Sequence, residues 1–322
     1  MFDKTTLTNH WLEAHAHARV ITCTPTMAGI GTTVCAVGVF DGLHQGHQFL
    51  IGEAVREARE RGVTATVVTF DRDPDELFLP AGRVRKVFSN EDRLAWLATC
   101  GVDYVLVIPF TQTLARTGPR QFLDEVFTGA LTPVSVHVGS DFRYGRKAAG
   151  EVGDLEAWAT GNSCAIHAHA LLCEEGLPIT ATRIRDALED TRLDEANELL
   201  TRPFYLRAQV VPGRRVGQSL GFPTANIVPS ASSVTLGDGV YGGYVYLNGD
   251  VYRTAVSVGV PATFEGVPAT IEAHILDFSG DLYDHEIKVA FVKHLRPMHA
   301  FSSPQELQKT VNANIDWVRT NL

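Results

Sequence analysis

The chain has 322 residues, enough for two domains, and its 45% hydrophobic and 20% charged content is ordinary for a globular protein. The formal net charge of −9 disfavours nucleic acid as the main partner, because polyanions are bound largely through Lys and Arg, although a nucleotide needs only a local positive site. We find no membrane-spanning apolar run and no leader-like start, and the five cysteines show no C-x-x-C spacing, so we expect a cytoplasmic protein with no membrane partner. Oligomeric state is left open.

From residue 34 to about 160, apolar β-branched runs alternate with helical patterns. We expect strands at 34–40, 63–70, 104–110 and 134–138, and helices at 45–61, 90–99 and 119–127. This alternation indicates βαβ units and a parallel sheet covered by helices on both faces. Ligands of such sheets bind beyond the C-terminal strand ends, and polar loops follow these strands at 41–47, 69–74, 110–111 and 139–145. Residues 1–30 show little pattern beyond a short helix expected over 11–18.

The segment after the first expected strand holds two histidines. A turn at Asp41-Gly42 leads to His44, Gly46 and His47 at the start of a helix. A helix N-terminus offers free N–H groups to phosphate, and Gly46 lets the backbone approach a ligand closely. Two imidazoles three residues apart can reach one phosphate where negative charge develops. A zinc pair is the alternative, but no further ligands stand nearby at a typical spacing.

After a helix expected over 193–200, β signals replace the helical alternation. Short strands are expected at 205–211, 243–247, 252–258, 270–276 and 286–292, with a hairpin turn at Asn248-Gly249. This pattern indicates a small antiparallel barrel. A capping box at Ser303–Glu306, with Pro304 in the first turn, predicts one final helix that runs to residue 322.

The expected barrel has a second group of polar residues. The loop from 211 to 221 is basic and glycine-bearing, and such a flap can lay N–H groups on a triphosphate. Thr224 and Asn226 alternate along an extended segment, so their oxygens can face one Mg²⁺ ion. Glu272 is the candidate base for an alcohol-phosphorylating site, because a charged group inside an apolar barrel strand needs a reason. The alternative places Glu272 on the solvent face with His274.

Several of these motifs resemble one family. The pattern Gly38-x-Phe40-Asp41-Gly42-x-His44-x-Gly46-His47 resembles the H-x-G-H signature of nucleotidylyltransferases, and its longer form is similar to bacterial bifunctional riboflavin kinase/FMN adenylyltransferases. The loop 138–146, the helix start Ile179–Arg185 and the segment Gly221–Asn226 resemble further motifs of that family. The resemblance covers nearly all of residues 34–322. It implies an α/β fold with a nucleotidylyltransferase-type parallel-sheet domain at 1–198, and a small antiparallel β-barrel domain with a terminal helix at 199–322.

By this resemblance, the first domain transfers AMP from ATP to FMN and releases pyrophosphate. His44 and His47 would stabilise the transition state at the α-phosphate, with help from Arg185, whose planar fork suits phosphate oxygens. The resemblance assigns nucleotide binding to Gly38, Phe40, Gly46, Asp141 and Thr182, and flavin binding to Asp71 and Phe142. From the residues alone, Phe142 could equally plug the core beneath a surface turn.

By the same resemblance, the second domain phosphorylates riboflavin with Mg-ATP. Thr224 and Asn226 would hold Mg²⁺, and Glu272 would act as base. Nucleotide binding is assigned to Gly213, Gly217 and Gly221, and Arg296 is assigned to the flavin site. The partners implied are therefore riboflavin, FMN and ATP.

Four departures from the family pattern bear on these expectations. Asp73 replaces the His of T-F-D-P-H-P, Ala181 replaces the second Ser of I-S-S-T, Asp284 stands where Gly is usual, and Val260–Phe264 replaces G-T-x-P-T-F. An anion such as Asp73 near phosphates weakens binding unless it meets Mg²⁺ or points away. Two alternatives stay open: a riboflavin kinase with an impaired or inactive adenylyltransferase domain, and a flavin-binding regulatory protein without turnover.

Overall fold

The fold is known from a computed structural model, which describes residues 17–24, 27, 29–80, 83–127, 131–213, 222–259 and 270–322. The chain divides into two compact units. Residues Ala14–Val84 and Ser89–Ala181 form the first, here the sheet unit, whereas Arg85–Phe88 and Thr182–Leu322 belong to the second, here the barrel unit. The helix expected over 11–18 lies almost wholly outside the described residues. The domain limits 1–198 and 199–322 remain predictions.

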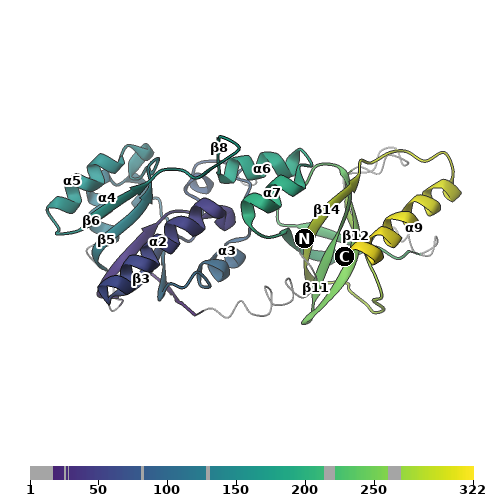
Figure 1. Ribbon diagram of the computed structural model, residues 1–322, viewed down its shortest axis with the longest axis horizontal. Helices are drawn as coiled ribbons and strands as arrows, with labels where there is room; N and C mark the ends of the chain where they lie inside the picture. The colour runs from purple at the N-terminus through teal and green to yellow at the C-terminus, as the bar shows by residue number, and fades with distance from the viewer. Residues whose placement is uncertain are drawn as a thin grey trace. The chain divides into compact units, whose positions relative to one another are not determined.

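The sheet unit contains a parallel sheet, as the sequence predicts. Its strands, within the described residues, are β1 (Arg19–Thr22), β2 (Thr32–Val37), β3 (Thr64–Phe70), β4 (Tyr104–Ile108), β5 (Thr132–Gly139) and β6 (Ala165–His169), in the order β1-β4-β3-β2-β5-β6 (Figure 1). The two edge strands, β1 and β6, were not expected. Both are short and largely exposed or half-buried, so they lack the continuous apolar run that marks a central strand.

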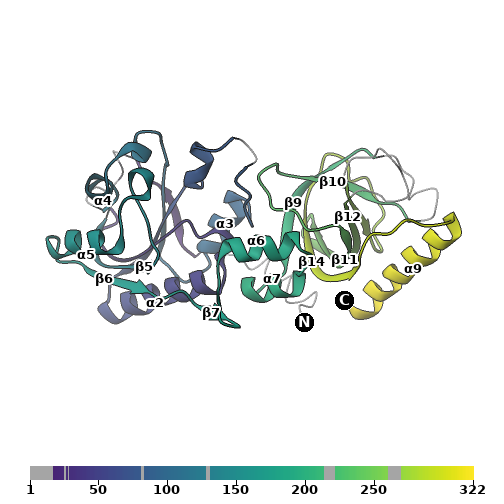
Figure 2. The same cartoon turned by 90° about the horizontal axis from the view of Figure 1, so that it is seen from above.

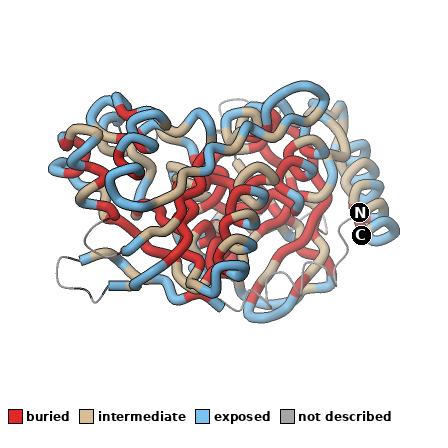
Figure 3. The backbone as a smooth tube through the Cα atoms, turned by 60° about the vertical axis from the view of Figure 1, so that its left-hand side comes forward, coloured by how far each residue is buried: buried red, intermediate tan, exposed pale blue. Residues whose placement is uncertain are grey.

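Helices cover both faces of this sheet. They are α2 (Gln45–Arg61), α3 (Asn90–Leu97), α4 (Pro119–Phe127) and α5 (Val152–Thr160). α2 buries Leu50, Ile51 and Ala54 on one face of the sheet, and Figures 1 and 2 show α4 and α5 beyond the other face. There the core contains Leu123 of α4 and Trp158 of α5, packed with alternate residues of the central strands. Figure 3 shows buried residues concentrated along those strands.

Short elements complete the sheet unit at its loops. They are the 3₁₀ turns η1 (Asp41–Leu43), η2 (Pro74–Leu77), η3 (Leu114–Arg116) and η4 (Arg146–Ala148), and the hairpin β7 (Cys173–Glu174) with β8 (Leu177–Pro178).

The barrel unit contains the expected closed antiparallel barrel. Its strands are β9 (Phe204–Val211), β10 (Ala225–Pro229), β11 (Gly239–Leu247), β12 (Asp250–Gly259), β13 (Thr270–Ile275) and β14 (Glu286–Arg296), closed in the order β10-β13-β12-β11-β14-β9. Closure leaves no free strand edge. The sequence did not predict β10. This strand is short, and its first residues, Ala225 and Asn226, are part of the motif Gly221–Asn226.

Within the described residues, the helices that accompany the barrel strands are α6 (Ala181–Glu189), α7 (Leu193–Leu200) and α9 (Pro304–Asn321). Asn197 of α7 donates from Nδ2 to Phe291 O at 3.0 Å and accepts from Phe204 N at 2.7 Å, which ties the helix to two strands. Ser303 caps α9 by accepting from Glu306 N, as predicted. Within the described residues, none of the helices combines the length and apolarity that crossing a membrane requires.

Candidate active sites

The turn between β2 and α2 has an unusual backbone. Phe40, Gly42 and Leu43 all have positive φ angles, of 59°, 74° and 43°. Such angles disfavour side-chain-bearing residues, so surrounding packing must hold Phe40 and Leu43, both of which are buried. The turn places His44 at the N-cap of α2. This position is at the C-terminal edge of the sheet, where parallel sheets bind their ligands.

The two histidines of this turn lie face to face. The rings of His44 and His47 stack with centroids 3.6 Å apart, and His47 meets the Phe40 ring edge-on at 5.2 Å. A Cβ at Gly46 would lie 3.3 Å from the His44 ring, tighter than an ordinary contact. The glycine is therefore needed to let the first imidazole fold back beside the second.

His47 is held neutral by its surroundings. Burial lowers the pKa of His47 well below its usual value, and the nearby positive charges of His44 and Arg93 lower it further. Its Nδ1 is buried and has no hydrogen-bond partner among the described residues. A bound phosphate would reverse the electrostatic balance, because an anion favours the protonated ring.

We expect the sheet unit to lose stability as the pH falls below about 6.5, the ordinary His value. Burial also lowers the pKa of His137 and of His169, so the unfolded chain binds more protons than the folded one below that pH. Stability then rises with pH across this window, by at most about 1.4 kcal/mol per pH unit for His47. Thermal unfolding of wild type and His47→Gln between pH 7 and 5 tests this: equal pH slopes would contradict it.

A pocket of about 260 Å³ opens at the His pair. Its wall comes from the end of β2, the first turn of α2, the loops after β5 and β6, and residues 179–181. It brings together these residues singled out by sequence: Gly38, Phe40, His44, Gly46, His47, Asp141 and Phe142. Phe142 both lines the pocket and packs on the core, so its two interpretations are compatible. A concave, mostly apolar wall with a few polar groups is typical of a ligand site.

Asp71 and Asp73 do not line this pocket. Asp71 Oδ1 accepts from Phe110 N at 2.8 Å, which joins the loops after β3 and β4. Asp73 caps η2: its Oδ1 accepts from Asp75 N at 2.9 Å, while Glu76 Oε1 accepts from Asp73 N at 2.8 Å. The carboxylate that departs from the family pattern is therefore bonded to its own turn. The assignment of Asp71 to flavin binding stays a prediction.

Sequence reasoning missed Arg93, a buried arginine of α3 that is only 3% exposed. It donates to Val39 O at 2.7 Å, to Thr69 Oγ1 at 2.7 Å and to Phe70 O at 2.6 Å. These bonds tie the ends of β2 and β3 together beneath the His pair. Helical spacing offered a signal, since Arg93 lies three and four positions before the buried Trp96 and Leu97.

Thr182 and Arg185 belong to the barrel unit. Arg185 donates to Thr182 Oγ1 at 3.0 Å within α6. Their assignments to phosphate and nucleotide binding remain predictions.

The barrel unit holds a second cluster of side-chain oxygens. Thr224 Oγ1 donates to Glu272 Oε2 at 3.2 Å, and Asn226 pairs with Glu272 in register across β10 and β13. Glu272 shares one face of β13 with His274, as the alternative placed it, and its role as base stays a prediction. Along β13, Ile271, Ala273 and Ile275 are buried, whereas Glu272 and His274 share the half-buried outer face. A strand alternates sides at every residue, so the three apolar residues leave Glu272 outside.

Two neighbours position this cluster. A Cβ at Gly213 would fall 1.7 Å from Asn226 Nδ2, so glycine gives the amide its space. His274 Nδ1 donates to Pro223 O at 2.8 Å and holds the segment that carries Thr224, a role that sequence reasoning missed. Gly217, Gly221 and the segment Val260–Phe264 lie outside the described residues.

Arg296 ends β14 beside the terminal segment. It donates to Pro297 O at 3.0 Å and stands 5.6 Å from the Phe301 ring centroid. Burial lowers the pKa of Arg296, and its Nε is buried with no hydrogen-bond partner among the described residues. Asp284 has a φ of 62°, which gives the physical reason why glycine is usual at that position.

The fold and the two clusters define a two-domain transferase with a nucleotidylyltransferase-type sheet and a kinase-type barrel. Residues 28–183 match the FAD synthetase family, and residues 200–322 match the riboflavin kinase family. The chain belongs to the family of bifunctional riboflavin kinase/FMN adenylyltransferases.

Relatives of that name match along most of their length. The chain is 33% identical to the Escherichia coli K12 protein, covering 86% of this chain and 89% of that one. It is 30% identical to the Bacillus subtilis protein, covering 87% and 89%. A Streptococcus pneumoniae structure titled as a macrolide-efflux protein is similar at a TM-score of 0.83 and 27% identity, covering 94% of this chain and 99% of that one.

Proposed function

We propose that this chain phosphorylates riboflavin to FMN in the barrel unit and adenylylates FMN to FAD in the sheet unit, with ATP as the donor in both reactions. The observation that carries the proposal is that each unit contains its own assembled polar site. The stacked His44–His47 pair lines the pocket of one unit, and the Thr224–Glu272 pair stands beside Asn226 in the other. Free thiols at all five cysteines support a reducing, cytoplasmic setting.

In the sheet unit, a phosphate oxygen of FMN attacks the α-phosphorus of ATP. The bond from that phosphorus to the bridging oxygen breaks, and pyrophosphate leaves. His44 and His47 donate hydrogen bonds to the α-phosphate oxygens, where negative charge increases in the transition state. The first turn of α2 lines the same pocket, and the free N–H groups of a helix N-terminus favour an anion. The roles expected for Arg185 at the α-phosphate and for Thr182 in nucleotide binding stay predictions, since both residues belong to the barrel unit.

In the barrel unit, the 5′-hydroxyl oxygen of riboflavin attacks the γ-phosphorus of ATP, and ADP leaves. Glu272 accepts the hydroxyl proton, and its bond from Thr224 fixes the carboxylate. The hydroxyl of Thr224 and the amide oxygen of Asn226 are hard oxygen donors on neighbouring positions, which fits Mg²⁺. When bound, that ion would neutralise charge on the phosphates. Arg296 is proposed to border the flavin.

Chromatography of flavins tests the proposal. Purified protein is incubated with Mg-ATP and either riboflavin or FMN. FAD from both substrates is the expected result. FMN from riboflavin without FAD from either substrate would indicate a kinase with a silent adenylyltransferase domain. No product from either would support the non-catalytic regulatory alternative.

The structure bears on the silent-domain alternative through Asp73. Because this carboxylate caps its own turn, we expect the double substitution Arg72→Pro with Asp73→His to leave FAD formation from FMN unchanged within about twofold, with a capping loss of about 1 kcal/mol. Initial rates with FMN check this. Asp73→Asn is the matched control, since asparagine keeps the cap and removes the charge. A several-fold rise in FAD output from the double variant would instead favour an impaired domain.

A further inference from the structure

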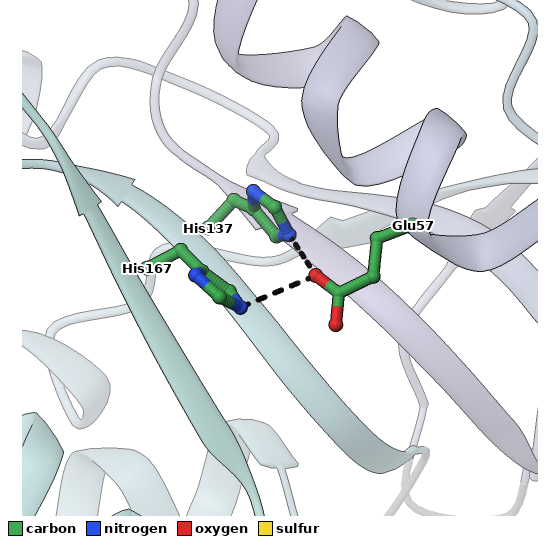
Figure 4. Close-up of side chains that lie close together, drawn as sticks. All are labelled: Glu57, His137 and His167. Carbon is green, nitrogen blue, oxygen red and sulfur yellow. Dashed lines mark hydrogen bonds and ion pairs between the residues drawn. The ribbon is translucent and has the colours of Figure 1, made fainter. Parts of the chain in front are cut away.

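A cluster of two histidines and one glutamate lies on the α2-facing side of the sheet. His137 of β5 and His167 of β6 are register partners on neighbouring parallel strands, and Glu57 reaches them from α2. Figure 4 shows both rings turned toward the carboxylate. One potential ligand atom from each residue lies within 4.8 Å of the others. Neither catalytic reaction uses these three side chains.

The distances within the cluster are short. Glu57 Oε2 lies 2.6 Å from His137 Nε2 and 3.3 Å from His167 Nε2. The side chains of Glu57 and His137 are 13% and 3% exposed, whereas His167 on the edge strand is 45% exposed. The cluster is therefore a largely buried carboxylate–imidazole pair with one solvent-facing imidazole, which gives an ion a path of entry.

The three residues are of types that ligate metals. A carboxylate with two imidazoles is a donor set that binds first-row divalent ions.

We propose that Glu57, His137 and His167 form a binding site for a divalent transition-metal ion of the Zn²⁺ type. Ligand atoms about 2.0–2.1 Å from a tetrahedral ion lie roughly 3.3 Å apart. The pair Glu57–His167 already has that spacing, and the pair Glu57–His137 must open by only about 0.7 Å, a small side-chain movement given the same zinc geometry. The ligand atoms of His137 and His167 lie within 4.8 Å of each other, so these two rings must also adopt the tetrahedral spacing. The fourth position would stay open.

A second layer of contacts orients these ligands. His169 Nε2 lies 2.9 Å from His137 Nδ1, so His137 can donate from Nδ1 when its Nε2 faces an ion. Arg61 and Ser135 donate to the Glu57 oxygens at 2.7 and 3.1 Å. Such partners fix the tautomer and direction of metal ligands. His169 also lines the pocket of the sheet unit, so the proposed site adjoins its wall.

Cobalt titration tests the site with the full chain, free of a histidine tag and stripped by chelator. We expect one Co²⁺ per chain with the visible absorption of tetrahedral cobalt, displaced by Zn²⁺, and a higher melting temperature with Zn²⁺. His167→Ala and Glu57→Gln should each weaken Co²⁺ binding by about 100-fold or more, beyond the effect of losing an outer contact. His167 is half exposed, so its variant keeps the test decisive if Glu57→Gln fails to fold.

Two controls match these variants. Glu60→Gln changes an exposed glutamate of the same helix, and His285→Ala removes an exposed histidine of the barrel unit. Both should bind Co²⁺ as wild type does. Equal binding by wild type and His167→Ala, or no tetrahedral cobalt spectrum in wild type, would show that the cluster is only a hydrogen-bonded network. The cobalt spectrum does not depend on flavin synthesis. The metal-site proposal can therefore be rejected without rejecting the proposed function, and the reverse also holds.

Discussion

Glutamine in place of Glu272 is expected to remove riboflavin phosphorylation while FAD formation from supplied FMN continues. Glutamine keeps the size of the side chain and its contact with Thr224, which lies 3.2 Å away, but an amide cannot accept the hydroxyl proton. Loss of a positioned general base lowers kcat by about 10²–10⁴-fold. Initial rates of FMN formation from riboflavin, measured by flavin chromatography, give the effect directly.

The matched control for this variant is Glu286→Gln. Glu286 is an exposed glutamate that begins β14, the next strand along the chain, and pairs with Arg207, so its loss should leave both reactions unchanged. Full kinase activity in Glu272→Gln would remove this residue from the role of base. Loss of both reactions in a folded variant would contradict the assignment of the two activities to separate units.

Alanine in place of His47 is expected to have the opposite selectivity. The ring lies in the pocket wall of the sheet unit, stacked on His44 at 3.6 Å, and we propose that it donates where charge develops on the α-phosphate. Removing one such donor costs about 10²–10³-fold in kcat. We therefore expect FAD formation from FMN to fall by that factor, whereas FMN formation from riboflavin stays unchanged in the same molecule.

The kinase reaction shows that the barrel unit is intact in that experiment, and thermal unfolding checks the sheet unit. His285→Ala serves as the histidine control. A change confined to KM for ATP would mean that His47 binds the ground state and transition state equally, which is not the role proposed here. FAD formation at the wild-type rate would exclude His47 from the chemistry altogether.

The central strands and most helices follow from local pattern. Apolar runs marked β2 to β5, and helical spacing marked α2 with the observed bounds, because burial on both faces and capping leave signals within a few residues. The sequence did not predict the edge strand β6 or the short strand β10. β6 is largely exposed or half-buried and lacks a continuous apolar run, and β10 has only five residues. Their pairing is decided by neighbours distant in the chain.

The sequence by itself determined the strand–turn–helix that carries His44 and His47, because both residues and the required glycine lie within one helical turn. It also determined the order of two motif sets along one chain. Only the tertiary structure decided that Arg93 braces two strand ends. The meeting of Glu57, His137 and His167 depends on strand register and on the path of α2 across the sheet. No local pattern encodes these long-range relations, since they arise from packing between segments up to 110 residues apart in number from Glu57 to His167.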